Sequence, residues 1–258
     1  MDAQIRGGLD GTSLKRLAAV LMLVDHIGAV LLEYILIYGS EAVLFHSPEW
    51  YAVYRWDRIL RTVGRLSFPI FCLLLSEGFL HTGNRKKYFL RLVLFALLSE
   101  IPFDLAVFDR LMAWEHQSVM AELALGLLTL WAAEEILERT GWEKELPVLG
   151  GAVLAGCLAA EAVRADYGAV GILYMAGFYY FRASRGGRTL TAGVLGFIDT
   201  AGFTVGSGAL SAVFVYLYNG RRRQGAGRWR YVFYGFYPVH LLVLFLIRRF
   251  WLGISAGG

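Results

Sequence analysis

The residues with the clearest capacity for chemistry lie inside an apolar stretch near the N-terminus. Asp25 and His26 lie within a run that starts at Leu14, about 11–12 residues in, so His26 lies near the middle of a span of about 20 residues. Lys15, His26 and Glu33 are separated by about three and about two helical turns, and therefore share one face. A histidine in this position takes or gives a proton near neutral pH, which suits general-base catalysis. Asp25 points about 100° away, and we expect it to meet a cation from another helix.

A second apolar run carries further ionisable residues. Arg61 and Arg65 lie at its start, and Arg65 directly precedes the apolar residues that begin at Leu66. An arginine at that depth is costly unless it lines a polar cavity. Glu77 and His81 lie about one helical turn apart and can pair, and Glu77 could orient either Arg65 or His81. Arg65 and Glu77 are therefore candidate catalytic residues.

Three other groups have a structural interpretation beside a functional one. The basic residues at 85–91 either set the membrane topology or bind the phosphates of a ligand. Two carboxylates that flank Pro102 either bind a substrate or cap a helix that the proline breaks. A histidine beside a proline in the last apolar run either supports the fold or supports the site. These groups are Arg85, Lys86, Lys87 and Arg91, then Glu100 and Asp104, and then His240.

The composition identifies the class of protein that must position these residues. Of 258 residues, 57% are hydrophobic and only 18% are charged, against about 25% in an average soluble domain. This indicates an integral membrane protein and excludes soluble, disordered and fibrous classes. The net charge of +4 does not indicate a nucleic-acid partner, because the basic residues lie between the apolar runs. Cys72 and Cys157 lie within such runs and indicate neither a disulfide framework nor a metal site.

The apolar runs predict an all-α, polytopic helical bundle that forms a single domain over residues 1–258. Nine spans are expected, and eight or ten remain possible because the runs between 189 and 219 are short and rich in glycine. Residues 41–60 are amphipathic, and their tryptophans and tyrosines suit a membrane interface. The expected spans are 14–38, 61–81, 87–108, 117–138, 146–163, 167–183, 189–203, 206–219 and 231–252.

The distribution of basic residues predicts the orientation of the bundle. With a cytoplasmic N-terminus, 17 Lys and Arg residues fall inside and eight fall outside, as the positive-inside rule requires. We therefore expect the C-terminus to lie outside. No cleavable signal peptide is expected, because the first apolar run is too long and lacks a small-residue cleavage site.

Motifs that span nearly the whole chain resemble those of the TraX family. The opening motif joins Leu14-Lys15 to Asp25-His26-Ile27-Gly28. Later motifs include Gly64-Arg65, Phe68-Pro69-Ile70-Phe71, Ser76-Glu77-Gly78, Asn84-Arg85-Lys86-Lys87-Tyr88, Ile101-Pro102-Phe103-Asp104, Asp166-Tyr167-Gly168 and Phe236-Tyr237-Pro238 with His240. The segment Gln117-Ser118-Val119-Met120 departs from the family pattern, which puts substrate contacts there in doubt.

The resemblance implies a membrane acetyltransferase, because the best-known TraX protein is associated with N-terminal acetylation of conjugative pilin. A wider resemblance is to acyltransferase-3 proteins and heparan glucosaminide acetyltransferases. The former have a basic residue, usually arginine, eleven positions before a histidine in the first span. Here Lys15 and His26 keep that spacing with lysine in place of arginine.

These expectations assign roles to the candidate residues. His26 is expected to act as general base or transient acetyl carrier, with Asp25, Arg65 and Glu77 as the other catalytic residues. Lys15, Arg85, Lys86, Lys87 and Arg91 are expected to bind the phosphates of acetyl-CoA, the acyl donor. Arg61, His81, Glu100, Asp104 and His240 are expected to contact the acceptor. The expected surroundings are the lipids of the inner (plasma) membrane, and the acceptor is a protein or a small molecule with an amine or hydroxyl group.

Two other functions fit parts of the pattern. Asp, Glu and His at mid-membrane depth are also typical of a proton-coupled transporter of small solutes. The basic cluster at one face and the absence of a visible inverted repeat favour the transferase. Gly206-Ser207-Gly208 resembles a serine-protease motif only superficially, because no histidine is placed convincingly for it.

Overall fold

The computed structural model describes residues 8–39, 45–141, 145–221 and 229–255, and all of these ranges are dominated by helices. No β-strand occurs in these ranges; two isolated bridges join Leu9 to Tyr218 and Gln117 to Ala165. The all-α prediction is therefore confirmed for the described part of the chain.

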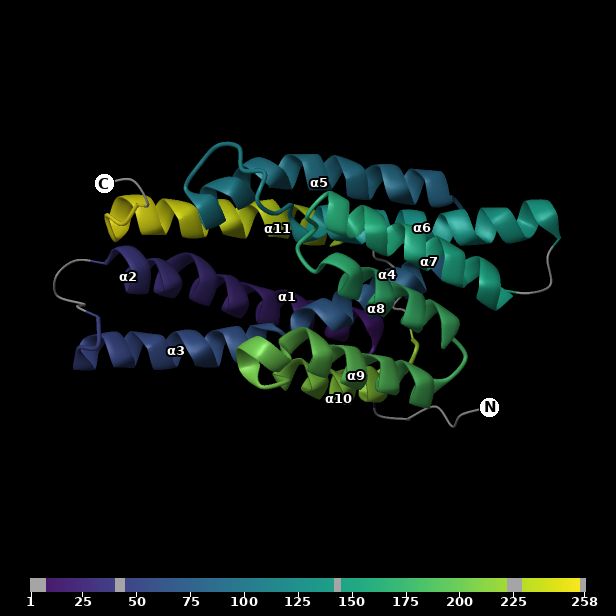
Figure 1. The fold of residues 1–258 in the computed structure, drawn as a ribbon, viewed down its shortest axis with the longest axis horizontal. Coiled ribbons are helices and arrows are strands. Elements are labelled where there is room, and N and C mark those ends of the chain that lie inside the picture. The colour runs from purple at the N-terminus through teal and green to yellow at the C-terminus, as the bar shows by residue number, and fades with distance from the viewer. Residues whose placement is uncertain (1–7, 40–44, 142–144, 222–228, 256–258) are drawn as a thin grey trace.

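The helices follow the predicted apolar runs closely and make nine passes within the described ranges (Figure 1). The first run is one continuous rod in which a π-helical turn separates two α-helices. The second pass starts earlier than predicted and breaks at Arg65 and Leu66. The elements are α1 (Gly11–Ile27), the π-helix η1 (Gly28–Leu32), α2 (Glu33–Tyr38), α3 (Pro48–Gly64), α4 (Ser67–Leu80), α5 (Arg85–Phe108), α6 (Val119–Thr140), α7 (Glu145–Ala162), α8 (Gly168–Tyr180), α9 (Arg185–Thr204), the 3-10 helix η3 (Ser207–Leu210), α10 (Ser211–Leu217), α11 (Trp229–Leu246) and the π-helix η4 (Ile247–Trp251).

Side-chain caps fix where several helices begin. Asp10, Ser47, Asn84 and Ser184 each accept a hydrogen bond from the backbone N–H three residues later, with N···O distances of 2.7–3.1 Å. Such caps satisfy backbone donors that the first turn of a helix leaves unpaired. Pro48 adds a preset φ angle at the first turn of α3. The starts of α1, α3, α5 and α9 are therefore encoded locally.

Four segments are long and apolar enough to cross a membrane: Gly11–Tyr38, Pro48–Leu80, Glu145–Ala162 and Val232–Trp251. Leu97, Leu158 and Phe197, on three different helices, are each more than half exposed. Large apolar side chains on the outside of a bundle are expected where lipid, rather than water, is the surrounding solvent. The helices are those of a membrane protein.

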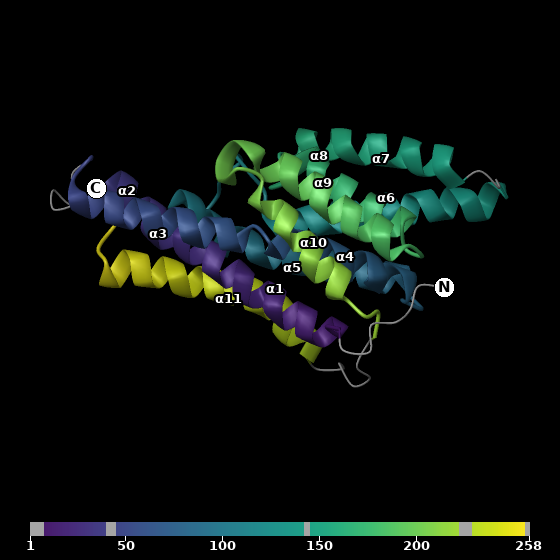
Figure 2. The same cartoon turned by 90° about the horizontal axis from the view of Figure 1, so that it is seen from below.

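The chain enters the bundle at one end and leaves it at the other (Figures 1 and 2). α1 begins to the right of centre in both views and runs leftward, and η4 finishes at the left-hand end. We call the first of these the basic end, because it carries Lys15, Arg16, Arg85, Arg139 and Arg188. α3 packs antiparallel along α1, η1 and α2, while α5 packs on α11 and on α6.

The predicted amphipathic segment is helical from Pro48 onward, whereas residues 41–44 lie outside the described ranges. It forms the first part of α3 and packs against η1 and α2 rather than forming a separate element. Tyr51, Tyr54 and Trp56 are exposed on its surface. Its position at a membrane interface remains a prediction.

Candidate functional site

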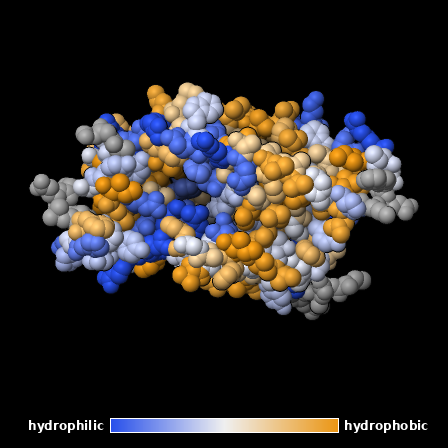
Figure 3. Space-filling view, viewed as in Figure 1, coloured by the Kyte–Doolittle hydropathy of each residue, from blue (hydrophilic) through white to orange (hydrophobic). Residues whose placement is uncertain are grey.

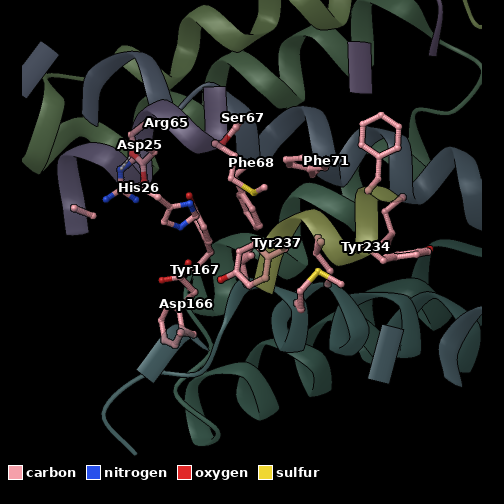
Figure 4. A pocket seen from close by; sticks show the side chains of 18 of the residues that line it. Asp25, His26, Arg65, Ser67, Phe68, Phe71, Asp166, Tyr167, Tyr234 and Tyr237 are labelled. Carbon is pink, nitrogen blue, oxygen red and sulfur yellow. Dashed lines mark ion pairs between the residues drawn. The ribbon is translucent and has the colours of Figure 1, made fainter. Parts of the chain in front are cut away.

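A cavity of about 860 Å³ extends along the inside of the bundle. Lys15, Arg16 and Tyr88 line it near the basic end, and Tyr38 and His116 line it toward the opposite end. Figure 3 shows hydrophilic residues around a hollow on one face of an otherwise largely hydrophobic surface. Side chains from α1, the α3–α4 junction, the connection between α7 and α8, and α11 converge in the middle of the cavity. Those central residues are Arg61 together with Asp25, His26, Arg65, Phe68, Asp166, Tyr167 and Tyr237, and Figure 4 labels all of them except Arg61.

His26 forms a hydrogen-bonded pair with His240 of α11. His240 Nε2 lies 2.9 Å from His26 Nδ1, and His240 Nδ1 lies 2.7 Å from the carbonyl oxygen of Phe236. A carbonyl oxygen only accepts, so neutral His240 carries its proton on Nδ1 and accepts through Nε2. His26 must then donate from Nδ1, which leaves its Nε2 unprotonated. His26 lines the cavity with a nitrogen that can serve as a base.

This pairing corrects the expected role of His240. It was predicted to contact the acceptor, but the structure places it behind His26, outside the cavity lining. Phe236 stacks on the His240 ring, with centroids 4.8 Å apart, and Tyr237 meets the edge of His26 at 5.9 Å. His240 thus orients His26 instead of contacting a ligand.

Asp25 meets arginines from another pass, as its position on α1 predicted. Its Oδ2 lies 2.5 Å from Arg61 Nη1, and its Oδ1 lies 4.0 Å from Arg65 Nε. Arg61 also reaches Glu33, with Nε 3.1 Å from Oε1. The predicted face of Lys15, His26 and Glu33 is confirmed as a face of the cavity, but Arg61 is occupied by two carboxylates and is not free for an acceptor.

Two glycines allow the close approach that these ion pairs require. Gly64 of α3 packs directly on the backbone of Asp25, where a Cβ atom would overlap it. On the facing surface, a Cβ at Gly28 would lie 2.9 Å from Arg61 Cδ. Phe203 of α9 covers the arginines from outside, with its ring centroid 4.0, 5.5 and 5.2 Å from the guanidinium carbons of Arg58, Arg61 and Arg65. The charged cluster is therefore enclosed on both sides.

Asp166 and Tyr167 lie in the connection between α7 and α8, and sequence reasoning did not assign them to the site. Tyr167 stacks face to face on Phe68, with centroids 3.5 Å apart. The Asp166 side chain is accessible from the cavity, which protein surrounds. The surrounding protein removes water from the carboxylate, and this desolvation raises the pKa of Asp166 to about 6. The sequence feature that could have indicated this role is an aspartate between two apolar runs, within the Asp166-Tyr167-Gly168 motif.

The basic end differs in part from the expected phosphate cluster. Lys15 lies over the rings of Phe233 and Tyr234, 4.5 and 5.7 Å from their centroids, and Arg91 lies 5.5 Å from the centroid of Tyr88. Lys15, Arg16 and Tyr88 line the cavity, whereas Lys86 and Lys87 are exposed outside it.

Arg85 departs further from its expected role. Its guanidinium binds Glu134 at 2.7 Å and Glu138 at 2.8 Å, and both glutamates belong to α6. Two carboxylates neutralise Arg85, so its expected role as a phosphate ligand is not supported. The residue instead holds α5 against α6.

Of the two roles expected for Glu77, orienting Arg65 or orienting His81, the structure supports only contact with His81. Glu77 Oε1 lies 3.0 Å from Arg188 Nη1 on α9, and its Oε2 lies 3.9 Å from Nδ1 of the exposed His81. Twelve residues of helix separate Glu77 from Arg65, or about 18 Å at 1.5 Å per residue. Glu77 and His81 both lie outside the cavity lining, and the Glu77–His81 pairing itself is confirmed.

Glu100 and Asp104 stabilise the connection between α5 and α6, and they do not cap a broken helix, because α5 continues through Pro102. Glu100 Oε1 accepts hydrogen bonds from Ser118 Oγ at 2.7 Å and from Ser118 N at 3.2 Å. Asp104 accepts one from the backbone N–H of Ala113 at 2.9 Å. Neither carboxylate lines the cavity, so direct contact with an acceptor there is not supported.

Comparisons with known proteins agree with the resemblance found in the sequence. The family model described as TraX protein matches residues 10–248. A probable fimbrial assembly protein, FimC of serogroup H1 from Dichelobacter nodosus, is 27% identical over 260 residues, which covers 92% of this chain and 95% of that protein. No solved structure matches the chain.

Proposed function

This chain belongs to the TraX family, and we propose that it is an inner-membrane acetyltransferase whose nine helical passes all cross the bilayer. The donor is cytoplasmic acetyl-CoA, and the basic end faces the cytoplasm. The observation that carries the proposal is His26, whose Nε2 is left as a base in a cavity that extends from Lys15 toward Tyr38. A transferase that joins a donor on one side to an acceptor from the other needs such a passage.

The reaction assigned to His26 is attack of the acceptor on the acetyl thioester. An acceptor amine forms a C–N bond to the carbonyl carbon, and the C–S bond breaks. His26 Nε2 takes the proton that the amine nitrogen loses and returns it to the departing sulfur. Arg65 lines the same cavity and faces Asp25, the neighbour of His26, and it is assigned the stabilisation of the negative oxygen that forms during the attack.

The basic end has groups that suit the donor. Lys15 and Arg16 supply positive charge at the cavity wall, and the rings of Tyr88, Phe233 and Tyr234 supply flat apolar faces. Phosphates and a purine base are recognised by such groups. Along α1, eleven residues separate Lys15 from His26, or about 16 Å, which a long pantetheine arm can bridge.

A protein amino terminus is the acceptor that the relatives favour. The relative from Dichelobacter nodosus, which this chain matches over almost its full length, is described as a probable fimbrial assembly protein. Fimbriae are built from pilin-type subunits, so such a subunit is the acceptor we propose. The acceptor would enter from the end of the cavity near Tyr38 and His116.

The decisive experiment uses the full chain, reconstituted in liposomes, with isotope-labelled acetyl-CoA and a peptide that carries a free N-terminal amine. We expect labelled acetyl-peptide by mass spectrometry, and a rate lower by about 10²–10⁴-fold for His26→Ala. His46, which is exposed and hydrogen-bonds only to Tyr51 among the described residues, supplies the matched control His46→Ala. A wild-type rate in His26→Ala, or failure of the solubilised protein to bind acetyl-CoA, would contradict the proposal.

A further inference from the structure

Asp166 has a distinctive position among the acidic residues of the cavity. Asp25 and Glu33 also line the cavity, and both are paired with Arg61. The Asp166 side chain forms no hydrogen bond or ion pair with the residues that the structure describes. In the view of Figure 4, His26 lies between the Asp25–Arg65 pair and Asp166. A carboxylate without an ion-pair partner among the described residues thus lines the same cavity as the reactive histidine.

The fold holds Asp166 at the wall of the cavity. The connection before α8 lines the cavity with Asp166 and Tyr167, whereas Arg164 is exposed and Ala165 is buried. Irregular backbone is tolerated in a membrane bundle where it lines a polar cavity. The backbone N–H of Gln117 donates to the carbonyl oxygen of Arg164 at 2.9 Å, and Tyr167 is stacked on Phe68. Contacts two residues before and one residue after Asp166 therefore hold its backbone in place.

The charges around the cavity centre favour a cationic guest. Arg61 and Arg65 face three carboxylates that line the cavity, namely Asp25, Glu33 and Asp166. One carboxylate is therefore left over at the centre. The rings of Tyr167 and Tyr237 line the same region, and aromatic faces add attraction for an ammonium group.

We propose that Asp166 binds the ammonium group of the acceptor and makes the enzyme selective for primary amines over hydroxyl acceptors. This inference rests on the proposed function. The ammonium passes one proton to the Asp166 carboxylate before the neutral amine attacks the thioester. His26 takes the second proton during the attack, and Asp166 later releases its proton toward the opposite end of the cavity.

The ionisation of Asp166 suits this role. Its pKa of about 6 lies below that of an α-amino group, at about 7.7–8.0, so the carboxylate is charged and the amine protonated near pH 7. Burial is the main cause of the raised pKa, and nearby charges modify it. The charged and titratable groups that face Asp166 are Arg65 and Arg61 at the α3–α4 junction, Asp25 of α1, Glu100 of α5, His116 of the α5–α6 connection, Glu122 of α6, the adjoining Tyr167 and Tyr237 of α11.

The test compares Asp166→Asn with wild type on two peptides that differ only at the N-terminal group, an amine in one and a hydroxyl in the other. We expect kcat/KM for the amine peptide to fall about 10- to 100-fold, as loss of a charged hydrogen bond implies. The KM for acetyl-CoA and the rate with the hydroxyl peptide should stay within about twofold. Asp199→Asn is the matched control, because Asp199 interacts electrostatically with Arg65 but lies outside the cavity lining.

Two further readouts separate this inference from the proposed function. Wild-type kcat/KM for the amine peptide should rise as the pH increases through about 6, because the carboxylate must be charged, and Asp166→Asn should lack that rise. Without acetyl-CoA, the amine peptide should raise the melting temperature of wild type but not of Asp166→Asn. Equal loss with both peptides would overturn the inference and assign Asp166 a structural role. If acetyl transfer is absent but the amine peptide still raises the melting temperature through Asp166, the proposed function alone is overturned. If acetyl transfer and the rise in melting temperature are both absent, the proposed function and this inference are both overturned.

Discussion

At the scale of single residues, the site depends on which nitrogen of each histidine carries the proton. The carbonyl oxygen of Phe236 determines the tautomer of His240, and His240 in turn determines that of His26. This arrangement resembles other catalytic histidines, whose second nitrogen is held by a hydrogen-bonding partner. Here the partner is a neutral imidazole instead of a carboxylate, so it directs the proton on His26 without adding a negative charge.

Replacing His240 tests this chain of hydrogen bonds. In His240→Ala, His26 loses the acceptor of its Nδ1 proton, and we expect kcat to fall roughly 10- to 100-fold, as part of the contribution of a general base. The KM for acetyl-CoA should not change, since His240 lies outside the cavity lining. His240→Gln supplies an amide oxygen as acceptor and should recover part of kcat. Equal kcat in the two variants would show that His240 only fills space.

The ion pair between Asp25 and Arg61 should contribute to stability. The two side chains are only 14% and 12% exposed, and removing one partner of a buried pair typically costs about 3–5 kcal/mol. Arg65, whose Nε lies 4.0 Å from Asp25 Oδ1, lessens that cost here. Arg61→Gln should therefore lower the apparent melting temperature in detergent by several degrees, and Asp25→Asn should restore part of it in the double variant.

Arg58 provides the control for that experiment. It lies three residues before Arg61 on α3 and contacts the ring of Phe203, but it makes no ion pair with the described residues. Arg58→Gln should change the melting temperature less than Arg61→Gln. If the melting temperature of the double variant falls by the sum of the decreases in the two single variants, Asp25 and Arg61 are not coupled.

At the scale of elements, the site requires α1 and α3 to cross at very short range. Side chains of ordinary size would separate the helices and move Arg61 away from Asp25. Gly64 and Gly28 remove that obstacle, and small residues serve the same purpose at many helix contacts in membranes. The break between α3 and α4 then turns Arg65 toward the cavity instead of continuing the helix past it.

Gly64→Ala should therefore disturb both stability and activity. Its Cβ would overlap the backbone of Asp25, which a rotamer change cannot relieve, so the helices must separate. Overpacking of this kind costs about 1–3 kcal/mol, and we expect a lower melting temperature together with reduced acetyl transfer. Gly83→Ala is the matched control, since its Cβ would meet no atom within 4 Å. Comparable effects in the two variants would contradict the importance of this crossing.

At the scale of the whole molecule, local sequence signals were sufficient for the helices and for one face of the cavity. The apolar runs located the nine passes, and helical periodicity placed Lys15, His26 and Glu33 together. Both inferences use spacings within one helix, which the helix geometry fixes. The partner cation of Asp25 was also predictable, because an unpaired carboxylate at that depth is too costly.

Contacts between distant passes were not predictable in the same way. His26 and His240 are 214 positions apart, and their meeting depends on how α11 packs against α1. Asp166 reaches the cavity from the connection between α7 and α8, and its place there depends on how these helices pack against α1 and α3. The partners of Arg85 and Glu77 likewise lie on other helices. Composition identified these residues as unusual but could not tell an interhelical ion pair from a ligand site.

The orientation of the bundle gives a test that does not depend on catalysis. Gly83 lies at the basic end, between α4 and α5, whereas the exposed Met112 lies in the connection between α5 and α6. With the two natural cysteines replaced, Met112→Cys should react with a membrane-impermeant maleimide in right-side-out vesicles. Gly83→Cys should react only after the membrane is opened, because the excess of basic residues retains that end in the cytoplasm. The reverse pattern would invert the topology and bring the donor to the end near Tyr38 and His116, where the described cavity lining has no lysine or arginine to bind its phosphates.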